Sequence, residues 1–135
     1  MRILGLDPGE KRIGVAVTDP LGLTAQGIDV INYSDLDEAI DAVEKICRSF
    51  EVSEIVVGNP LNMDGTGGQA SEKAILFAAK LKKRLNLPVV MIDERLTTVR
   101  AEKTLISGGV SRKNRRKVKD KLAAALILEH YLATK

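Results

Sequence analysis

Acidic residues stand at three places in this sequence where a fold can bring them together. Asp7 follows the apolar run Ile3 to Leu6, and Asp93 ends the run VVMID with Glu94 directly after it. Asp120 shares a helical face with Ala123, Ala124, Ile127 and Tyr131. Sites in open α/β sheets gather outside the carboxyl ends of the parallel strands. We therefore expect Asp7, one of Asp93 and Glu94, and Asp120 to converge.

Converging carboxylates repel one another and lose hydration, so they stay ionised only if a hard cation binds among them. Oxygen ligands without His or Cys favour Mg²⁺ or Mn²⁺. Two such ions about 3.5–4 Å apart would activate a water and stabilise the leaving oxygen of a phosphodiester. Each acid also has a structural interpretation: Asp7 as the first residue of a Pro-Gly turn, Asp93 or Glu94 as a helix cap, and Asp120 as a counter-charge for basic neighbours.

Positive charge is concentrated in one segment. Seven of the ten residues from Arg112 to Lys121 are Lys or Arg, although the net charge of the chain is only +3. Such a block binds polyanions more often than chance suggests, and the alternative is a solvated loop and helix start. The Gly65 to Gly68 stretch could cradle a phosphate on its main-chain amides or serve as a flexible connection.

The apolar periodicity predicts the elements that position these residues. Strands are expected over 2–7, 12–18, 24–32, 54–58 and 89–93, and a turn over Asp7 to Glu10 makes the first two a hairpin. Helices are expected over 36–50, 70–86 and 97–107, and a last helix follows the basic segment to about 133. This order predicts an α/β fold, with three antiparallel strands joined to a parallel extension.

Length and composition suit an ordinary globular protein. The chain has 135 residues, of which 44% are hydrophobic and 29% charged, so we expect a single domain over residues 1–135. Cys47 is the only cysteine and belongs to an apolar helical stripe, which indicates a core residue in a reducing compartment. With no apolar run of about 18 residues, we expect a cytoplasmic protein without signal peptide or membrane span.

Four motifs carry a family resemblance: DPGEKRIGVAVTD, VGNPLNMDGTGGQ, DERLTT and KDKLAAALILEHYL. In this order, and over essentially the whole chain, they resemble the YqgF (RuvX) family of pre-16S rRNA nucleases, once described as Holliday junction resolvases. The resemblance implies an RNase H-like fold, a mixed five-stranded sheet flanked by helices. It also implies divalent-metal phosphodiester hydrolysis and a cytoplasmic role in maturing the 5′ end of small-subunit rRNA, a step of ribosome biogenesis.

The resemblance also assigns roles to residues. The catalytic, metal-binding acids map to Asp7, Glu94 and Asp120, and Glu94 is favoured over Asp93 because Asp93 can serve the following turn. The more distant RuvC resolvases carry further acids where this chain has Gly58 and Ala123. The implied substrate-binding residues are Lys11, Arg12, Asn59, Asn62, Thr66, Arg95, Thr98, Arg112, Lys113, Arg115, Arg116 and Lys117.

The leading hypothesis is therefore a nuclease that uses Mg²⁺ or Mn²⁺ to cut structured RNA. One alternative is a Holliday junction resolvase-like DNA endonuclease. Another is a non-catalytic module that binds nucleic acid or the ribosome; with aromatic residues at 3% of the chain, backbone charge and shape would dominate its binding. An actin-like ATP phosphotransferase has a similar first hairpin but needs two lobes, and this chain has room for about one.

Overall fold

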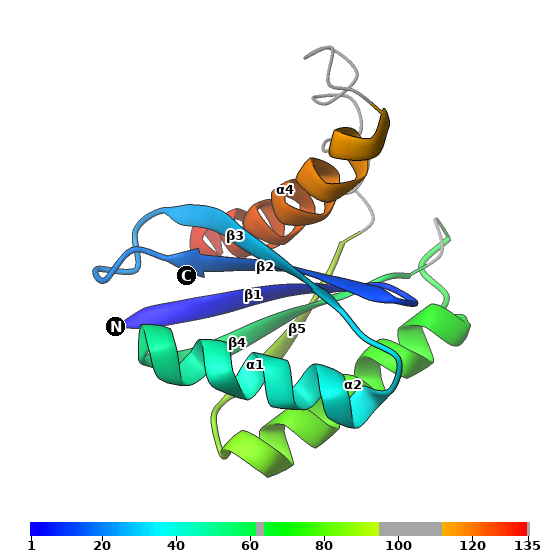
Figure 1. Cartoon of the computed structure of the whole chain (residues 1–135), viewed down its shortest axis with the longest axis horizontal. Coiled ribbons are helices and arrows are strands. Elements are labelled where there is room, and N and C mark those ends of the chain that lie inside the picture. Colours follow the sequence, from blue (N-terminus) through cyan, green and yellow to red (C-terminus); the bar gives the residue numbers. More distant parts are fainter. Residues whose placement is uncertain (62–63, 95–111, 135) are drawn as a thin grey trace.

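The sheet is the frame on which all other elements are placed. In a computed structural model, the structure describes residues 1–61, 64–94 and 112–134, with side chains from 116 onward in the last range. Five strands form one mixed sheet in the order β3-β2-β1-β4-β5. Helix α4 crosses one face of this sheet, and α1 and α2 cover the other (Figure 1).

The strand directions match the expected α/β topology. β1 (Arg2–Pro8), β2 (Arg12–Thr18) and β3 (Ala25–Asn32) are antiparallel neighbours. β4 (Val52–Asn59) runs parallel to β1, and β5 (Val89–Asp93) runs parallel to β4. The prediction of three antiparallel strands with a parallel extension is confirmed, although β4 is longer than the predicted strand over 54–58.

The helices begin and end where local chemistry favours it. α1 (Leu36–Phe50) begins after Asp35, whose side chain accepts a hydrogen bond of 2.9 Å from the Glu38 amide. α2 (Gln69–Leu85) ends at Asn86, which has a left-handed backbone with φ 55°. α4 spans Arg112–Ala133. The helix predicted over 97–107 lies outside the described residues.

Two local predictions are wrong. The hairpin turn lies two residues later than expected, because Asp7 and Pro8 still pair with β2 and the Gly9 amide donates to the Arg12 carbonyl at 2.8 Å. Pro8 needs no partner for an N–H and is therefore tolerated at the end of the strand. The basic segment is not irregular but forms the first turns of α4, because Lys and Arg are good helix formers and no Gly or Pro interrupts the run.

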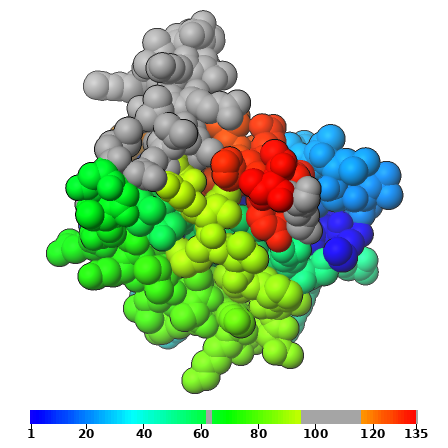
Figure 2. Space-filling model, turned by 180° about the vertical axis from the view of Figure 1, so that it is seen from behind, coloured from blue at the N-terminus to red at the C-terminus, as the bar shows by residue number. Residues whose placement is uncertain are grey.

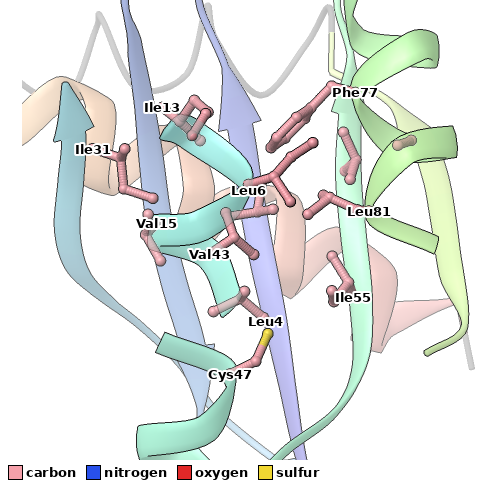
Figure 3. Packing of buried hydrophobic residues seen from close by; sticks show 14 of the residues in the cluster. Leu4, Leu6, Ile13, Val15, Ile31, Val43, Cys47, Ile55, Phe77 and Leu81 are labelled. Carbon is pink, nitrogen blue, oxygen red and sulfur yellow. The ribbon is translucent and has the colours of Figure 1, made fainter. Parts of the chain in front are cut away.

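The two faces of the sheet bury different kinds of residue. On the face covered by α1 and α2, large apolar side chains of the sheet, such as Leu4 and Leu6, pack against Val43 of α1 and Phe77 and Leu81 of α2 (Figure 3). Against α4 the cluster is smaller and includes Ala16, Ala124, Ala125, Ile127 and Leu128. Cys47 belongs to the larger cluster, as predicted.

The end of α4 packs at the surface between distant parts of the chain. Figure 2 shows it in red, between the yellow-green segment that leads into β5 and the blue connection from β2 to β3. Within the described residues, no helix is both long enough and apolar enough to cross a bilayer.

Candidate active site

Asp7 lies within β1 rather than in the hairpin turn. It pairs with Gly14 of β2. Because side chains alternate along a strand, Asp7 shares the α4 face with Ile3 and Gly5, while Leu4 and Leu6 face the larger core. The turn interpretation of Asp7 is therefore excluded, and its carboxyl group is held on a rigid strand.

Glu94 follows β5 and turns inward. Its amide donates to the Asn59 carbonyl at 3.3 Å, which continues the contact between the two chain segments. Glu94 is 4% exposed, whereas the neighbouring Asp93 is exposed. A Cβ added at Gly58 would lie 2.6 Å from Glu94 Oε2. The missing side chain at Gly58 is therefore what leaves room for Glu94.

Asp120 is brought to the same end of the sheet by α4. The helix crosses β2 so closely that a Cβ on Gly14 would lie 2.0 Å from the Asp120 carbonyl oxygen. The Asp120 carboxylate forms an ion pair with Arg12, with 3.0 Å between Oδ2 and Nε. Asp7 and Asp120 line one hollow of about 270 Å³, together with the hairpin residues Gly9, Glu10, Lys11 and Arg12.

Burial and neighbouring charges shift the pKa of all three carboxyl groups. A hydrogen bond joins Asp7 and Glu94. Burial, this hydrogen bond and the charge of Asp7 raise the pKa of Glu94 to about 10. Burial and the charge of Asp120 raise the pKa of Asp7. Burial also raises the pKa of Asp120, against the opposing effect of Arg12. Without a cation, Glu94 is protonated and donates to Asp7.

The carboxylate oxygens of Asp7, Glu94 and Asp120 suit a hard divalent cation once Glu94 has lost its proton and Arg12 has left Asp120. Among the residues that the structure describes, no three Asp, Glu, His or Cys side chains form a ready metal-binding group as they stand. Glu94 holds a proton against Asp7, and Arg12 holds Asp120. These are the substitutes for positive charge that buried carboxylates require. An ion at this position would displace the proton and compete with the guanidinium for the same oxygens.

The structure places several predicted substrate-binding cations around this hollow. Lys11 and Arg12 line it directly. Arg116 and Lys117 are exposed on α4, and the charge of Arg116 lowers the pKa of Asp120. Lys119, which the sequence analysis did not single out, lowers the pKa of both Asp7 and Asp120. Arg116 and Lys119 of α4 therefore lie close enough to the acidic hollow for their charges to act on its carboxyl groups.

Among the described residues, Asn59 and Thr66 do not line the hollow. Asn59 accepts a hydrogen bond of 2.6 Å from the Ser71 hydroxyl of α2, and Thr66 is bound to Asp64 in an exposed loop. The remaining predicted positions are outside the described residues or have side chains outside them: Asn62, Arg95, Thr98, Arg112, Lys113 and Arg115.

The sequence analysis did not identify two glycines that shape the candidate site. Gly14 sets the distance between α4 and β2, and Gly58 makes the space for Glu94. The sequence does contain a signal for them, because a glycine inside a strand often marks the close approach of another backbone segment. Gly5, Gly14 and Gly27 occur in three different strands, and each would contact α4 if it carried a Cβ.

Known proteins resemble this chain over its whole length. The family profile described as "RuvX: Holliday junction resolvase" matches residues 1–134. The chain belongs to the RuvX family. A relative from Clostridium novyi (strain NT), named "Putative pre-16S rRNA nuclease", is 49% identical over 132 residues, covering 98% of this chain and 98% of the relative. A relative of the same name from Clostridium tetani (strain Massachusetts / E88) is 52% identical over 132 residues, covering 98% and 96%.

Solved structures show the same fold. T. thermophilus RuvC in complex with a Holliday junction substrate superposes with a TM-score of 0.61 at 16% identity, covering 99% of this chain and 96% of that chain. At that identity the likeness establishes the fold alone. The resemblance to the RuvX family and the RNase H-like α/β fold are both confirmed.

Proposed function

We propose that this RuvX-family protein is a divalent-metal-dependent nuclease that processes the 5′ end of pre-16S rRNA. The observation that supports the proposal is the position of Asp7, which is hydrogen-bonded to Glu94 and interacts electrostatically with Asp120. Relatives of about half identity over the whole chain carry the name of this activity. The proposal places the protein in ribosome biogenesis, in the bacterial cytoplasm.

The metal site of this proposal is formed by Asp7, Glu94 and Asp120. Mg²⁺ or Mn²⁺ bound there would supply activation of a water and stabilisation of the leaving oxygen of the phosphodiester. Asp7, on a sheet strand, would hold a fixed position. Gly58 would keep the carboxylate of Glu94 within reach of Asp7, and Arg12 would move from Asp120 to a phosphate oxygen of the substrate.

RNA binding in this proposal depends on the cations around the hollow. Lys11 and Arg12 line it, Arg116 and Lys119 of α4 lie close enough to act on its carboxyl groups, and Lys117 is exposed on the same helix. Contacts with phosphates release counterions, so affinity would fall steeply with added salt. Arg112, Lys113 and Arg115 precede these residues in the same helix and would extend the same basic surface.

The direct test is cleavage of a pre-16S rRNA fragment that carries the precursor 5′ extension. Asp7→Asn keeps the size and shape of the side chain but removes a ligand charge, and we expect the Mg²⁺-dependent rate to fall by about a thousandfold. Asp93→Asn is the matched control, because Asp93 is exposed beside the buried Glu94. Unchanged cleavage by Asp7→Asn, or an equal loss in both variants, would rule out the proposed site.

A second candidate function is cleavage of branched DNA, because the matching family profile is described as a Holliday junction resolvase. RuvC resolvases carry acids where this chain has Gly58 and Ala123, and a side chain at Gly58 would collide with Glu94. A four-way DNA junction in the same assay separates the two candidates. Faster cutting of the junction than of the rRNA fragment would favour the resolvase.

A further inference from the structure

A second pocket lies on the other side of the β1–β2 hairpin from the acidic hollow. Its volume is about 400 Å³. The apolar part of its lining includes Ile13, Tyr33, Leu36 and Phe77. Residues with polar side chains line the same space: Glu10, Ser34, Asp35, Gln69 and Lys73. This combination, an apolar wall with a few polar groups, is typical of a binding site for a small organic group.

Aromatic side chains are scarce in this chain, and the pocket contains half of them. The sequence has two Phe and two Tyr, and Phe77 and Tyr33 both line this pocket. The other two rings have partners elsewhere: Arg2 lies over the ring of Phe50 at 5.3 Å, and the Tyr131 hydroxyl donates to Glu54. Phe77 is 2% exposed and packs in the larger core, so the ring that the pocket offers to a ligand is that of Tyr33, which is partly buried.

The pocket and the acidic hollow share part of the hairpin. Gly9 and Glu10 line both of them. The Tyr33 hydroxyl donates to the Gly9 carbonyl at 2.5 Å, which fixes the ring of Tyr33 against the hairpin turn. A ligand that extends from one site to the other therefore has to cross only the turn between β1 and β2.

We infer that this pocket binds one unpaired nucleobase of the RNA strand whose phosphate lies at the acidic hollow. The inference rests on the proposed function, because it takes RNA as the substrate. Unstacked bases are recognised by apolar and aromatic surfaces together with hydrogen bonds to their edges. Glu10 can accept from a base amino group, and Gln69 and Lys73 can donate to base carbonyl or ring nitrogen atoms.

Such a site has a functional consequence. A base can enter the pocket only where the strand is not in a continuous duplex. The pocket would therefore position single-stranded nucleotides next to the hollow, and it would favour cutting at an unpaired position. The basic surface on α4 supplies affinity without sequence preference. The pocket adds a contact that depends on one particular nucleotide.

The test measures binding of short single-stranded RNAs from the pre-16S 5′ region, each with one abasic nucleotide at a successive position. Fluorescence anisotropy in EDTA follows binding without cleavage. We expect one abasic position to weaken binding to the native protein by about tenfold, the effect of losing one base contact, while the other positions change it little. A flat abasic profile with the native protein would overturn the inference.

Filling the pocket gives a second measurement. Ala70 lines the pocket from the first turn of α2 and is exposed, so Ala70→Phe occupies the space without altering Asp7, Glu94 or Asp120. We expect Ala70→Phe to weaken binding of intact RNA by about tenfold and to abolish the position-dependent abasic effect. Ile75→Phe is the matched control, because Ile75 is 51% exposed on α2 and does not line the pocket.

The outcomes separate this inference from the proposed function. If folded Ala70→Phe protein bound intact RNA as tightly as the native protein and kept the same dependence on the abasic position, the pocket assignment would be overturned. If Ala70→Phe does not fold, the scan with the native chain decides. Mg²⁺-dependent cleavage together with a flat abasic profile would overturn only the pocket. A position-dependent abasic effect without cleavage at any Mg²⁺ concentration would overturn only the nuclease.

Discussion

The two faces of the sheet solve different physical problems. The face under α1 and α2 is packed with Leu4, Leu6, Val43, Phe77 and Leu81, and its role is to bury apolar volume. The face under α4 has Gly5, Gly14, Gly27 and Gly58 at positions where a Cβ would collide with a neighbour. Small residues bury little area but let a helix approach closely. One face therefore provides stability, and the other provides the short distances on which the acidic site depends.

The largest change in stability is expected on the face under α1 and α2. Leu81 is fully buried there, so Leu81→Ala should lower the free energy of unfolding by about 2–5 kcal/mol. The affinity for Mn²⁺ should stay within about twofold of native, because α4 and the acids are not touched. Urea denaturation and calorimetric titration measure the two quantities. A parallel loss of metal affinity would mean that the two faces are not independent.

Gly14→Ala tests the face under α4. The new Cβ would lie 2.0 Å from the Asp120 carbonyl, so α4 has to move away from β2. We expect a loss of about 1–3 kcal/mol in the free energy of unfolding. Despite this smaller destabilisation, Mn²⁺ affinity should fall far more than in Leu81→Ala. If native Mn²⁺ affinity persisted in Gly14→Ala, the close approach of α4 would be irrelevant to the site.

Gly58→Ala is a more local version of the same test. Its Cβ would meet two movable side-chain ends, Glu94 Oε2 and Ile127 Cδ1, each at 2.6 Å. The free energy of unfolding should therefore fall by at most about 1 kcal/mol. Ala loses less conformational entropy on folding than Gly does, and this gain partly offsets the crowding. Mn²⁺ affinity should fall about tenfold because Glu94 is displaced. Equal affinity in native and Gly58→Ala proteins would remove Glu94 from the site.

The pH dependence of stability reports on the metal-free acids. Burial raises the pKa of Glu94 from 4.5 to about 10, so over that range the folded protein keeps a proton that the unfolded chain has released. Metal-free stability should therefore fall as pH rises, by at most about 1.4 kcal/mol per pH unit. Glu94→Gln should flatten this dependence. A native stability that rises with pH from 5 to 9 would contradict the protonated state of Glu94.

Most of the frame was predictable from the sequence because it follows from periodicity and caps. The helix after Asp35, the core position of Cys47 and the strand ending at Asp93 all obey local rules. The hairpin turn was misplaced because Asp7-Pro8-Gly9 satisfies turn preferences, whereas the pairing of Pro8 with Ile13 depends on the neighbouring strand. Local sequence does not carry that tertiary information.

For the candidate site too, some features were predictable from the sequence and others were not. Spacing predicted that Asp7 and Asp120 would approach one another, and the resemblance favoured Glu94 over Asp93. The hydrogen bond between Asp7 and Glu94, the Arg12 ion pair and the pocket beside Tyr33 depend on contacts between distant segments. The Asn59 side chain faces α2 because residues alternate along β4, and only the observed register shows which way each one points.

The most direct test of the account is a crystal of this protein soaked in Mn²⁺ and measured for anomalous scattering. The account predicts density in contact with the carboxylates of Asp7, Glu94 and Asp120, with Arg12 released from Asp120. An Asp7→Asn crystal soaked in the same way should lose that density. Saturating Mn²⁺ that leaves no density between these three acids, or that binds only elsewhere on the molecule, would contradict the central claim.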